Sequence, residues 1–248
     1  ARKLSRTGHT SWTLTEIDFT DGPYLSENIT STTLTPSGTS GSVNITASAS
    51  TFAATDVGRL VSFSNGRAKI TGFTSATVVA ATTQDDFDNT NAVTAWKLGA
   101  FSGTTGHPSC VSFFEQRLVF AGTLAEPQTL YFSKSGDYEN MTTGTNADDA
   151  MVYTIASNQV NRIRYLKSVR TLIVGTTGGE FTVSADGTDA AITPTNIVIK
   201  KQSSYGTANV DAQPAGSSIL FLQKAKRKIR ELTYNFDVDG YVAADLTI

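Results

Sequence analysis

The chain has 248 residues, and its 39% hydrophobic and 17% charged residues allow one large folded domain or two smaller ones. Its formal net charge of −2 and its pI of about 5.7 exclude the strongly basic character of a general nucleic-acid binder. The single cysteine, Cys110, excludes an intrachain disulfide and a cysteine-based zinc site.

The first segment has the alternation of a β-strand. The chain starts in a polar strand-like stretch, and the period of 2 in Trp12–Phe19 places Trp12 and Leu14 on one face. A turn at Gly22-Pro23 ends this segment. The 38 threonines favour strands along the whole chain, and no stretch is predicted to be helical.

The two ends of the sequence are typical of a piece cut from a longer protein. The first residue is Ala1 rather than a methionine, and the last residues carry no terminal signal. No signal peptide is recognised, and no apolar run approaches the roughly 18 residues of a membrane-spanning helix. We therefore expect further parts of the protein outside these residues.

Residues 29–100 differ from their surroundings in composition. Five short strand patterns, rich in Thr, Ser and Ala, follow one another between Gly, Asn and Asp turns. Asn65-Gly66 is the strongest short-range signal for a hairpin turn. We expect this segment to form an inserted small β-barrel or sandwich module.

Three hairpins are predicted after the Gly/Thr loop at Ala100–Pro108. Each has an apolar strand, a polar turn and an alternating strand, and they recur about every 50 residues, a spacing compatible with the blades of a β-propeller. The paired segments are Ser112–Gly122 with Pro127–Ser135, Val169–Thr177 with Gly179–Asp186, and Ser217–Gln223 with Lys228–Asn235.

The polar stretch that follows Phe132 raises the question of a catalytic site. Nucleophilic catalysis by Ser133 or Ser135 needs a base within hydrogen-bond reach and an oxyanion hole. The spacings Ser-x-x-Lys and Gly-x-Ser-x-Gly are absent here. We therefore predict that Ser133, Lys134, Ser135 and Asp137 shape turns.

The sequence signals for metal and phosphate sites are equally weak. His9 and His107 lack further ligands at a meaningful spacing. The loop with Asp85, Asp86 and Asp88 lacks the EF-hand glycine and distal glutamate, and Asp148-Asp149 is likewise predicted to be a solvated loop. The glycines of Gly175–Gly179 lack the Lys-Ser/Thr of a P-loop, so we interpret them as a hairpin turn. No metal ion or cofactor is expected.

A basic turn remains as the candidate contact site. It carries five positive charges, on Lys224, Lys226, Arg227, Lys228 and Arg230. Such a cluster binds DNA phosphates, keeps a hairpin soluble and unpaired, or forms ion pairs with another subunit. All three interpretations stay open, and we favour a solvated or subunit-facing turn over DNA binding.

Two stretches of the chain resemble a known family. Trp12–Tyr24, followed by a Thr-rich β insertion, and then His107–Met141 are similar to the tail nozzle (tail tubular protein B) family of short-tailed bacteriophages and prophages. The most specific part is the run from Phe113 to Tyr138. The insertion is also similar to a small β module found in the first catalytic-cysteine half-domain of ubiquitin-activating enzymes, but Cys110 lies outside it.

The resemblance implies an all-β fold with a partial β-propeller-like body, formed by residues 1–28 and 101–248, around the insertion 29–100. It implies a non-enzymatic structural subunit of a homo-oligomeric ring, a hexamer in the family. That ring lies in the virion tail below the portal and adaptor, contacts the adaptor and distal tail proteins, and lets phage DNA pass. It is assembled in the bacterial host cytoplasm and takes no small-molecule substrate.

Two other functions fit an all-β, Thr-rich chain. A carbohydrate-binding adhesin or tail-fibre module would gather exposed aromatic residues on one face, whereas Trp12 and Trp96 are expected to be packing residues. A propeller-type glycoside hydrolase needs two carboxylates facing one pocket. Asp137, Glu139 and Glu180 show no recognisable pairing in the sequence.

Overall fold

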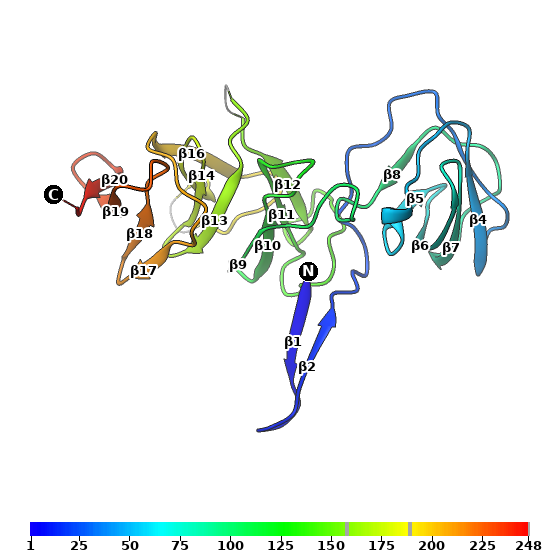
Figure 1. Cartoon of the computed structure of the whole chain (residues 1–248), viewed down its shortest axis with the longest axis horizontal. Coiled ribbons are helices and arrows are strands. Elements are labelled where there is room, and N and C mark those ends of the chain that lie inside the picture. Colours follow the sequence, from blue (N-terminus) through cyan, green and yellow to red (C-terminus); the bar gives the residue numbers. More distant parts are fainter. Residues whose placement is uncertain (157–158, 188–189, 248) are drawn as a thin grey trace. The chain divides into compact units, whose positions relative to one another are not determined.

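The chain is built almost wholly of β-strands, which confirms the all-β class. The computed structural model describes residues 1–156, 159–187 and 190–247, and its one short 3-10 helix is Ala54–Asp56 (Figure 1). The chain folds as two compact units. The inserted unit is Asp21–His107, and the body unit is Ala1–Thr20 together with Pro108–Ile248. No helix among the described residues has the length and apolarity to cross a membrane.

The inserted unit is one antiparallel sheet of six strands in the order β3-β4-β7-β6-β5-β8. The strands are β3 (Leu34–Pro36), β4 (Ser42–Ala47), β5 (Leu60–Phe63), β6 (Gly66–Ser75), β7 (Val78–Asp85) and β8 (Trp96–Leu98). The sheet curls around a single apolar core that includes Leu34, Ile45 and Val61. The strand pattern expected from the sequence is confirmed, although these strands form one sheet rather than the two facing sheets of a sandwich.

The borders of the inserted unit lie outside the expected residues 29–100. The flanking segments are hydrogen-bonded into it: Leu25 N donates to Leu98 O at 2.9 Å, and Ala100 N donates to Pro23 O at 2.7 Å. Beyond Ala100, Gly103 N donates to Thr55 O at 3.1 Å. Residues 21–28 and 101–107 therefore belong to the inserted unit rather than to the body.

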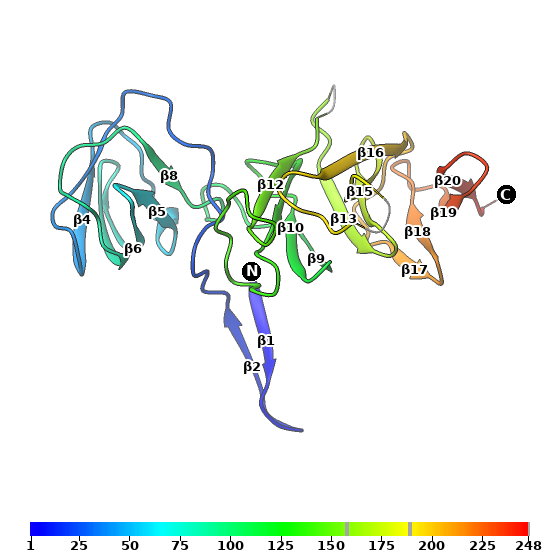
Figure 2. The ribbon, with the colours of Figure 1, turned by 180° about the vertical axis from the view of Figure 1, so that it is seen from behind.

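Three four-stranded antiparallel sheets follow one another in the body unit (Figures 1 and 2). In each, the strands pair in chain order, as in a meander. The first sheet is β9 (Cys110–Phe114), β10 (Arg117–Ala121), β11 (Thr129–Phe132) and β12 (Met151–Thr154). The second sheet is β13 (Ile163–Ser168), β14 (Leu172–Thr176), β15 (Gly179–Ala185) and β16 (Ile197–Ser203). The third sheet is β17 (Gln213–Ala215), β18 (Ser218–Leu222), β19 (Ile229–Asn235) and β20 (Gly240–Asp245).

The second sheet is covered on both faces. Leu172 and Val174 pack with the first sheet, in a core that includes Val119 and Leu130. Ile173, between them in β14, points the other way into a core with the third sheet. Because successive side chains of a strand alternate between its faces, a strand buried on both sides reads as a continuous apolar run.

One predicted strand is in fact a hairpin. Ser112–Gly122 was expected as a single strand, but β9 ends at Phe114 and β10 starts at Arg117. The turn residues Glu115 and Gln116 have φ values of 46° and 59°. Such a left-handed conformation is usually signalled by Gly, Asn or Asp, so the sequence carries no turn signal here.

The body unit also has an arm, the hairpin of β1 (Arg2–Arg6) and β2 (Trp12–Glu16), which extends away from the three sheets (Figures 1 and 2). The expectation that Trp12 packs in a core is wrong, because 54% of its surface is exposed. Trp96, in contrast, packs against the core of the inserted unit, and its ring nitrogen donates to Thr32 O at 2.9 Å.

Candidate functional site

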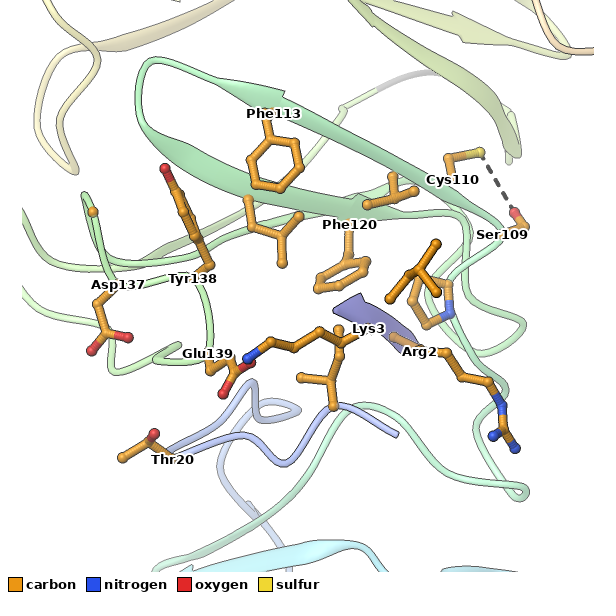
Figure 3. A pocket seen from close by; sticks show the side chains of 17 residues that line it. Arg2, Lys3, Thr20, Ser109, Cys110, Phe113, Phe120, Asp137, Tyr138 and Glu139 are labelled. Atoms are coloured by element: carbon orange, nitrogen blue, oxygen red, sulfur yellow. Dashed lines mark hydrogen bonds and ion pairs between the residues drawn. The ribbon is translucent and has the colours of Figure 1, made fainter. Parts of the chain in front are cut away.

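A pocket of about 720 Å³ lies between the foot of the arm and the first sheet (Figure 3). Aromatic side chains form much of its wall: Phe113 and Tyr138 meet edge to face, with their ring centroids 5.1 Å apart, and Phe120 lies below them. Phe120 is buried, whereas 59% of Phe113 and 41% of Tyr138 are exposed. The pocket therefore offers an apolar, partly open surface.

Two charged groups of this pocket, Lys3 and Glu139, are paired with each other. Lys3 Nζ lies 2.5 Å from Glu139 Oε1 (Figure 3). Asp137, which lines the same pocket, is exposed in a turn. Glu180, the third carboxylate considered for glycoside hydrolysis, is buried in β15 and is not part of this pocket. Of the three, only Asp137 and Glu139 share a pocket, and Lys3 neutralises one of them.

Ser133 has a structural role in the first sheet. Its side chain is fully buried, accepts a hydrogen bond from Leu118 N at 2.9 Å and donates one to Lys134 O at 2.8 Å. Lys134 Nζ lies 3.1 Å from Asp149 Oδ1, and this hydrogen bond lowers the pKa of the Asp149 carboxyl. These contacts hold the segment from Ser133 to Asp149 against the sheet.

Arg117 is the centre of this segment, and the sequence analysis missed it. Its side chain is 2% exposed. Nη1 donates to Ser133 O at 2.8 Å and to Asp149 O at 2.7 Å, and Nη2 donates to Ala147 O at 2.5 Å. Arg117 shares its strand face with Val119, a core residue, and a charged residue at a core-facing position is the signal that identifies such an anchor.

Replacing Ser133 with alanine is expected to lower the free energy of unfolding by about 1–3 kcal/mol, because Leu118 N would be left buried without an acceptor. This is more than a turn residue would contribute. Denaturant unfolding of the wild type and of Ser133→Ala measures this loss of unfolding free energy. The control is Ser135→Ala, at an exposed position of the same loop, where we expect a change within about 0.5 kcal/mol. Equal effects at the two positions would contradict the structural role of Ser133.

The other candidates from the sequence do not converge on one place. His9 Nδ1 lies 2.9 Å from Arg6 Nη2 near the tip of the arm. His107 is at the end of the inserted unit. Arg67 pairs with Asp85 at 2.9 Å, and Asn65 donates to Asp88 at 2.6 Å. Within the described ranges, no group of three or more His, Cys, Asp or Glu side chains is placed to hold a metal ion.

The basic turn separates into three parts. Lys224, Lys226 and Arg227 are exposed and make no ion pair with any described residue. Lys228 pairs with Asp245 of β20. Arg230 is 8% exposed, donates to Ala243 O at 2.8 Å, and its guanidinium carbon lies 3.4 Å from the centre of the Tyr205 ring. Arg230 is therefore a structural residue of the third sheet, and not part of an exposed contact.

Glu180 is a buried carboxyl group with incomplete hydrogen bonding. Ser203 donates to its Oε2, whereas Oε1 has no partner among the described atoms. Burial, the largest cause, raises the pKa of Glu180 above its ordinary value of 4.5, although Ser203 and Arg230 act in the opposite direction. Folding therefore shifts this group towards its neutral form relative to the unfolded chain.

Glu180→Gln is expected to remove one pH dependence of stability. Since the folded pKa is raised, the stabilisation is fully present below the unfolded pKa and is lost as the pH rises through the folded pKa. The wild type should thus lose stability relative to the variant as the pH rises from the unfolded pKa of Glu180 through its higher folded pKa. Unfolding free energies at several pH values measure this, with Glu16→Gln, at an exposed position, as the control. Parallel curves for wild type and Glu180→Gln would refute it.

The polar side chains that the sequence singled out thus mainly hold loops and strands together. Two exposed features of the described residues stand out: the aromatic pocket at the foot of the arm, and the cations Lys224, Lys226 and Arg227. Both are suited to contact with another molecule. No family model matches this chain, and no curated protein matches it.

Proposed function

We propose that the chain is a structural subunit of a ring in the tail nozzle of a short-tailed bacteriophage or prophage. The observation that supports this most is the repetition of four-stranded meander sheets along the body unit. Four-stranded meander sheets that repeat in chain order are typical of the blades of a β-propeller, which supports this proposal. The segment with the most specific resemblance, Phe113 to Tyr138, contributes to β9, β10, β11 and the loop after β11.

The chemistry of that segment also favours a structural role. Arg117 and Ser133 satisfy main-chain groups, and Lys134 forms an ion pair with Asp149. A rigid body with large lateral surfaces is what a ring subunit needs. The small net charge of −2 limits electrostatic retention of DNA that passes through a channel.

The partners of this proposal are further copies of the chain in a six-fold ring, the tail adaptor and distal tail proteins, and DNA in transit. Lys224, Lys226 and Arg227 are the residues that we propose for contact with a neighbouring subunit or with DNA. The protein would lie in the virion tail after assembly in the host cytoplasm, and would act without catalysis, cofactor or metal.

A carbohydrate-binding adhesin or tail-fibre module is the second candidate. The exposed aromatic residues Trp12, Phe113 and Tyr138 favour it, because aromatic faces are what sugar-binding surfaces present. A propeller-type glycoside hydrolase has less support, since Glu139 is paired with Lys3 and Glu180 is buried elsewhere.

Electron microscopy tests the proposal. An antibody raised against the chain should label the tail of virions below the portal, and image averages of the purified whole protein should show six-fold rings. Binding to a panel of bacterial surface glycans is the matched assay for the adhesin. Absence of six-fold rings, together with specific glycan binding, would establish the second candidate instead.

A further inference from the structure

A second pocket, of about 840 Å³, lies where turns of all three sheets of the body unit meet. Its described lining includes Glu115 and Gln116 of the β9–β10 turn, Arg170 of the β13–β14 turn and Asp239 of the β19–β20 turn. We call it the turn pocket. Loops that a rigid scaffold holds in place carry a large share of binding residues, and the volume lies within the range of small-molecule sites.

Residues with an unfavourable backbone conformation gather at the turn pocket. Among the described residues of the body unit, four that are not glycine have a positive φ, and three of these four line the pocket. Glu115 has a φ of 46°, Gln116 of 59° and Asp239 of 45°. Side chains disfavour this left-handed conformation, and residues held in it cluster at ligand sites. Their concentration in one pocket favours a binding role.

The hydrogen-bond donors of the turn pocket are open to a ligand. Arg170 and Lys200 are exposed and form no ion pair with any described residue. The guanidinium carbon of Arg170 lies 5.9 Å from the centre of the Tyr234 ring, a contact that uses none of its N–H groups. The side-chain amide of Gln116 is exposed and has no hydrogen-bond partner among the described groups.

The acidic side chains of the turn pocket differ in how far they are engaged. Glu115 Oε2 accepts a hydrogen bond from Ile192 N at 2.6 Å, and Asp239 Oδ1 accepts one from Tyr234 Oη at 2.5 Å. The side chain of Asp186, directly after β15, is exposed and has no partner in the described part of the chain. Asp186 is therefore the carboxylate that remains as an acceptor for a ligand.

The charges of the turn pocket select against ionic ligands. It contains two cations and three carboxylates: Arg170, Lys200, Glu115, Asp186 and Asp239. An ion of either sign would therefore meet like charge. A hydroxyl group suits this wall, because it both donates and accepts hydrogen bonds. Tyr234, which is 39% exposed, adds an apolar ring face. A saccharide, a neutral ring with several hydroxyls and an apolar face, fits all of these groups.

We propose that the turn pocket binds a neutral saccharide unit. Arg170 and Lys200 donate hydrogen bonds to its hydroxyl oxygens, and Asp186 accepts hydrogen bonds from its hydroxyl groups. Gln116 donates and accepts through its amide, and the ring of Tyr234 packs against the C–H face. In the described residues, the site shares no lining with the pocket of Figure 3. It uses no contact between subunits, so the inference goes beyond the proposed ring and does not rest on it.

NMR titration of the intact chain tests the site, with the methyl glycosides of glucose, galactose, mannose and N-acetylglucosamine as probes. At least one of them is expected to bind. Arg170→Ala and Asp186→Ala should each weaken that binding by about tenfold or more, because each removes a hydrogen bond made by a charged group. The matched controls are Arg227→Ala and Asp237→Ala, at exposed positions outside the pocket, which should bind like wild type. Thermal unfolding shows that each variant is folded.

Gln116→Gly separates binding from stability. Glycine adopts a positive φ readily, so the thermal unfolding temperature should not fall, whereas loss of the amide should weaken binding. The uronate and the amino sugar related to the glycoside that binds should bind more weakly than the neutral form. Three results would overturn the proposal: no binding of the four glycosides, equal binding by wild type, Arg170→Ala and Asp186→Ala, or preference for a charged sugar. Each would leave the proposed ring as it stands, because subunit assembly is scored separately by microscopy.

Discussion

Replacing Arg117 with alanine is expected to destabilise the protein by about 3 kcal/mol or more. The guanidinium satisfies the main-chain oxygens of Ser133, Ala147 and Asp149 in a buried position. Without it, these acceptors lose their donors and the space of a long side chain is left unfilled. Urea or thermal unfolding of the intact chain measures the loss.

Two comparisons show where this effect comes from. Arg117→Lys keeps the positive charge but loses the planar fork, so we expect most of the loss to remain. Arg2→Ala removes an exposed arginine whose Nη2 lies 3.1 Å from Glu16 Oε1, and it should change stability by about 0.5 kcal/mol or less. An Arg117→Ala variant as stable as Arg2→Ala would show that the loop does not depend on this anchor.

A methyl group at Gly175 is expected to cost about 3 kcal/mol, the upper part of the range for overpacked cores. A Cβ there would lie 2.0 Å from Cε1 and 2.3 Å from Cζ of Tyr165. The ring of Tyr165 lies over the glycine and belongs to the core between the second and third sheets. Gly175→Ala must therefore displace a buried aromatic residue, and its thermal unfolding temperature should fall.

The matched control is another glycine within a strand. A Cβ at Gly72 of β6 would lie 3.6 Å from Ala80 Cβ, an ordinary contact, so Gly72→Ala should change stability by about 1 kcal/mol or less. A double-mutant cycle adds a second test. Tyr165→Ala should cost much less in the Gly175→Ala background than alone, because both changes act on one contact. Additive losses would exclude the steric explanation.

The fold could be predicted best where the turn residues themselves favour the backbone conformation of the turn. A hairpin was predicted at Asn65-Gly66 and is present, but its turn lies one residue earlier: Ser64 and Asn65 have φ values of 49° and 56°, and Gly66 begins β6 opposite Phe63. The turn between β14 and β15, next to Gly179, was likewise predicted. The turn at Glu115 and Gln116 was not, because these residues have little local preference for a left-handed conformation and are held there by pairing of β9 with β10.

The site could be predicted less well than the fold, because single-sequence patterns do not show which charges are buried. The basic turn was recognised as a cluster, but the stacking of Arg230 on Tyr205 depends on a residue in the connection before β17. The exposure of Trp12 was not foreseen either. An alternating strand pattern shows which residues share a face, and leaves open whether anything covers that face.

The hydrogen bonds that close the inserted unit have a consequence for the evolution of the protein. Main-chain bonds join Pro23 to Ala100 and Leu25 to Leu98, so the chain enters and leaves the unit at neighbouring points. A module with adjacent ends can be lost, gained or exchanged by recombination without stretching the sequence that receives it. Related chains could therefore differ entirely in the inserted unit while retaining the three sheets of the body unit.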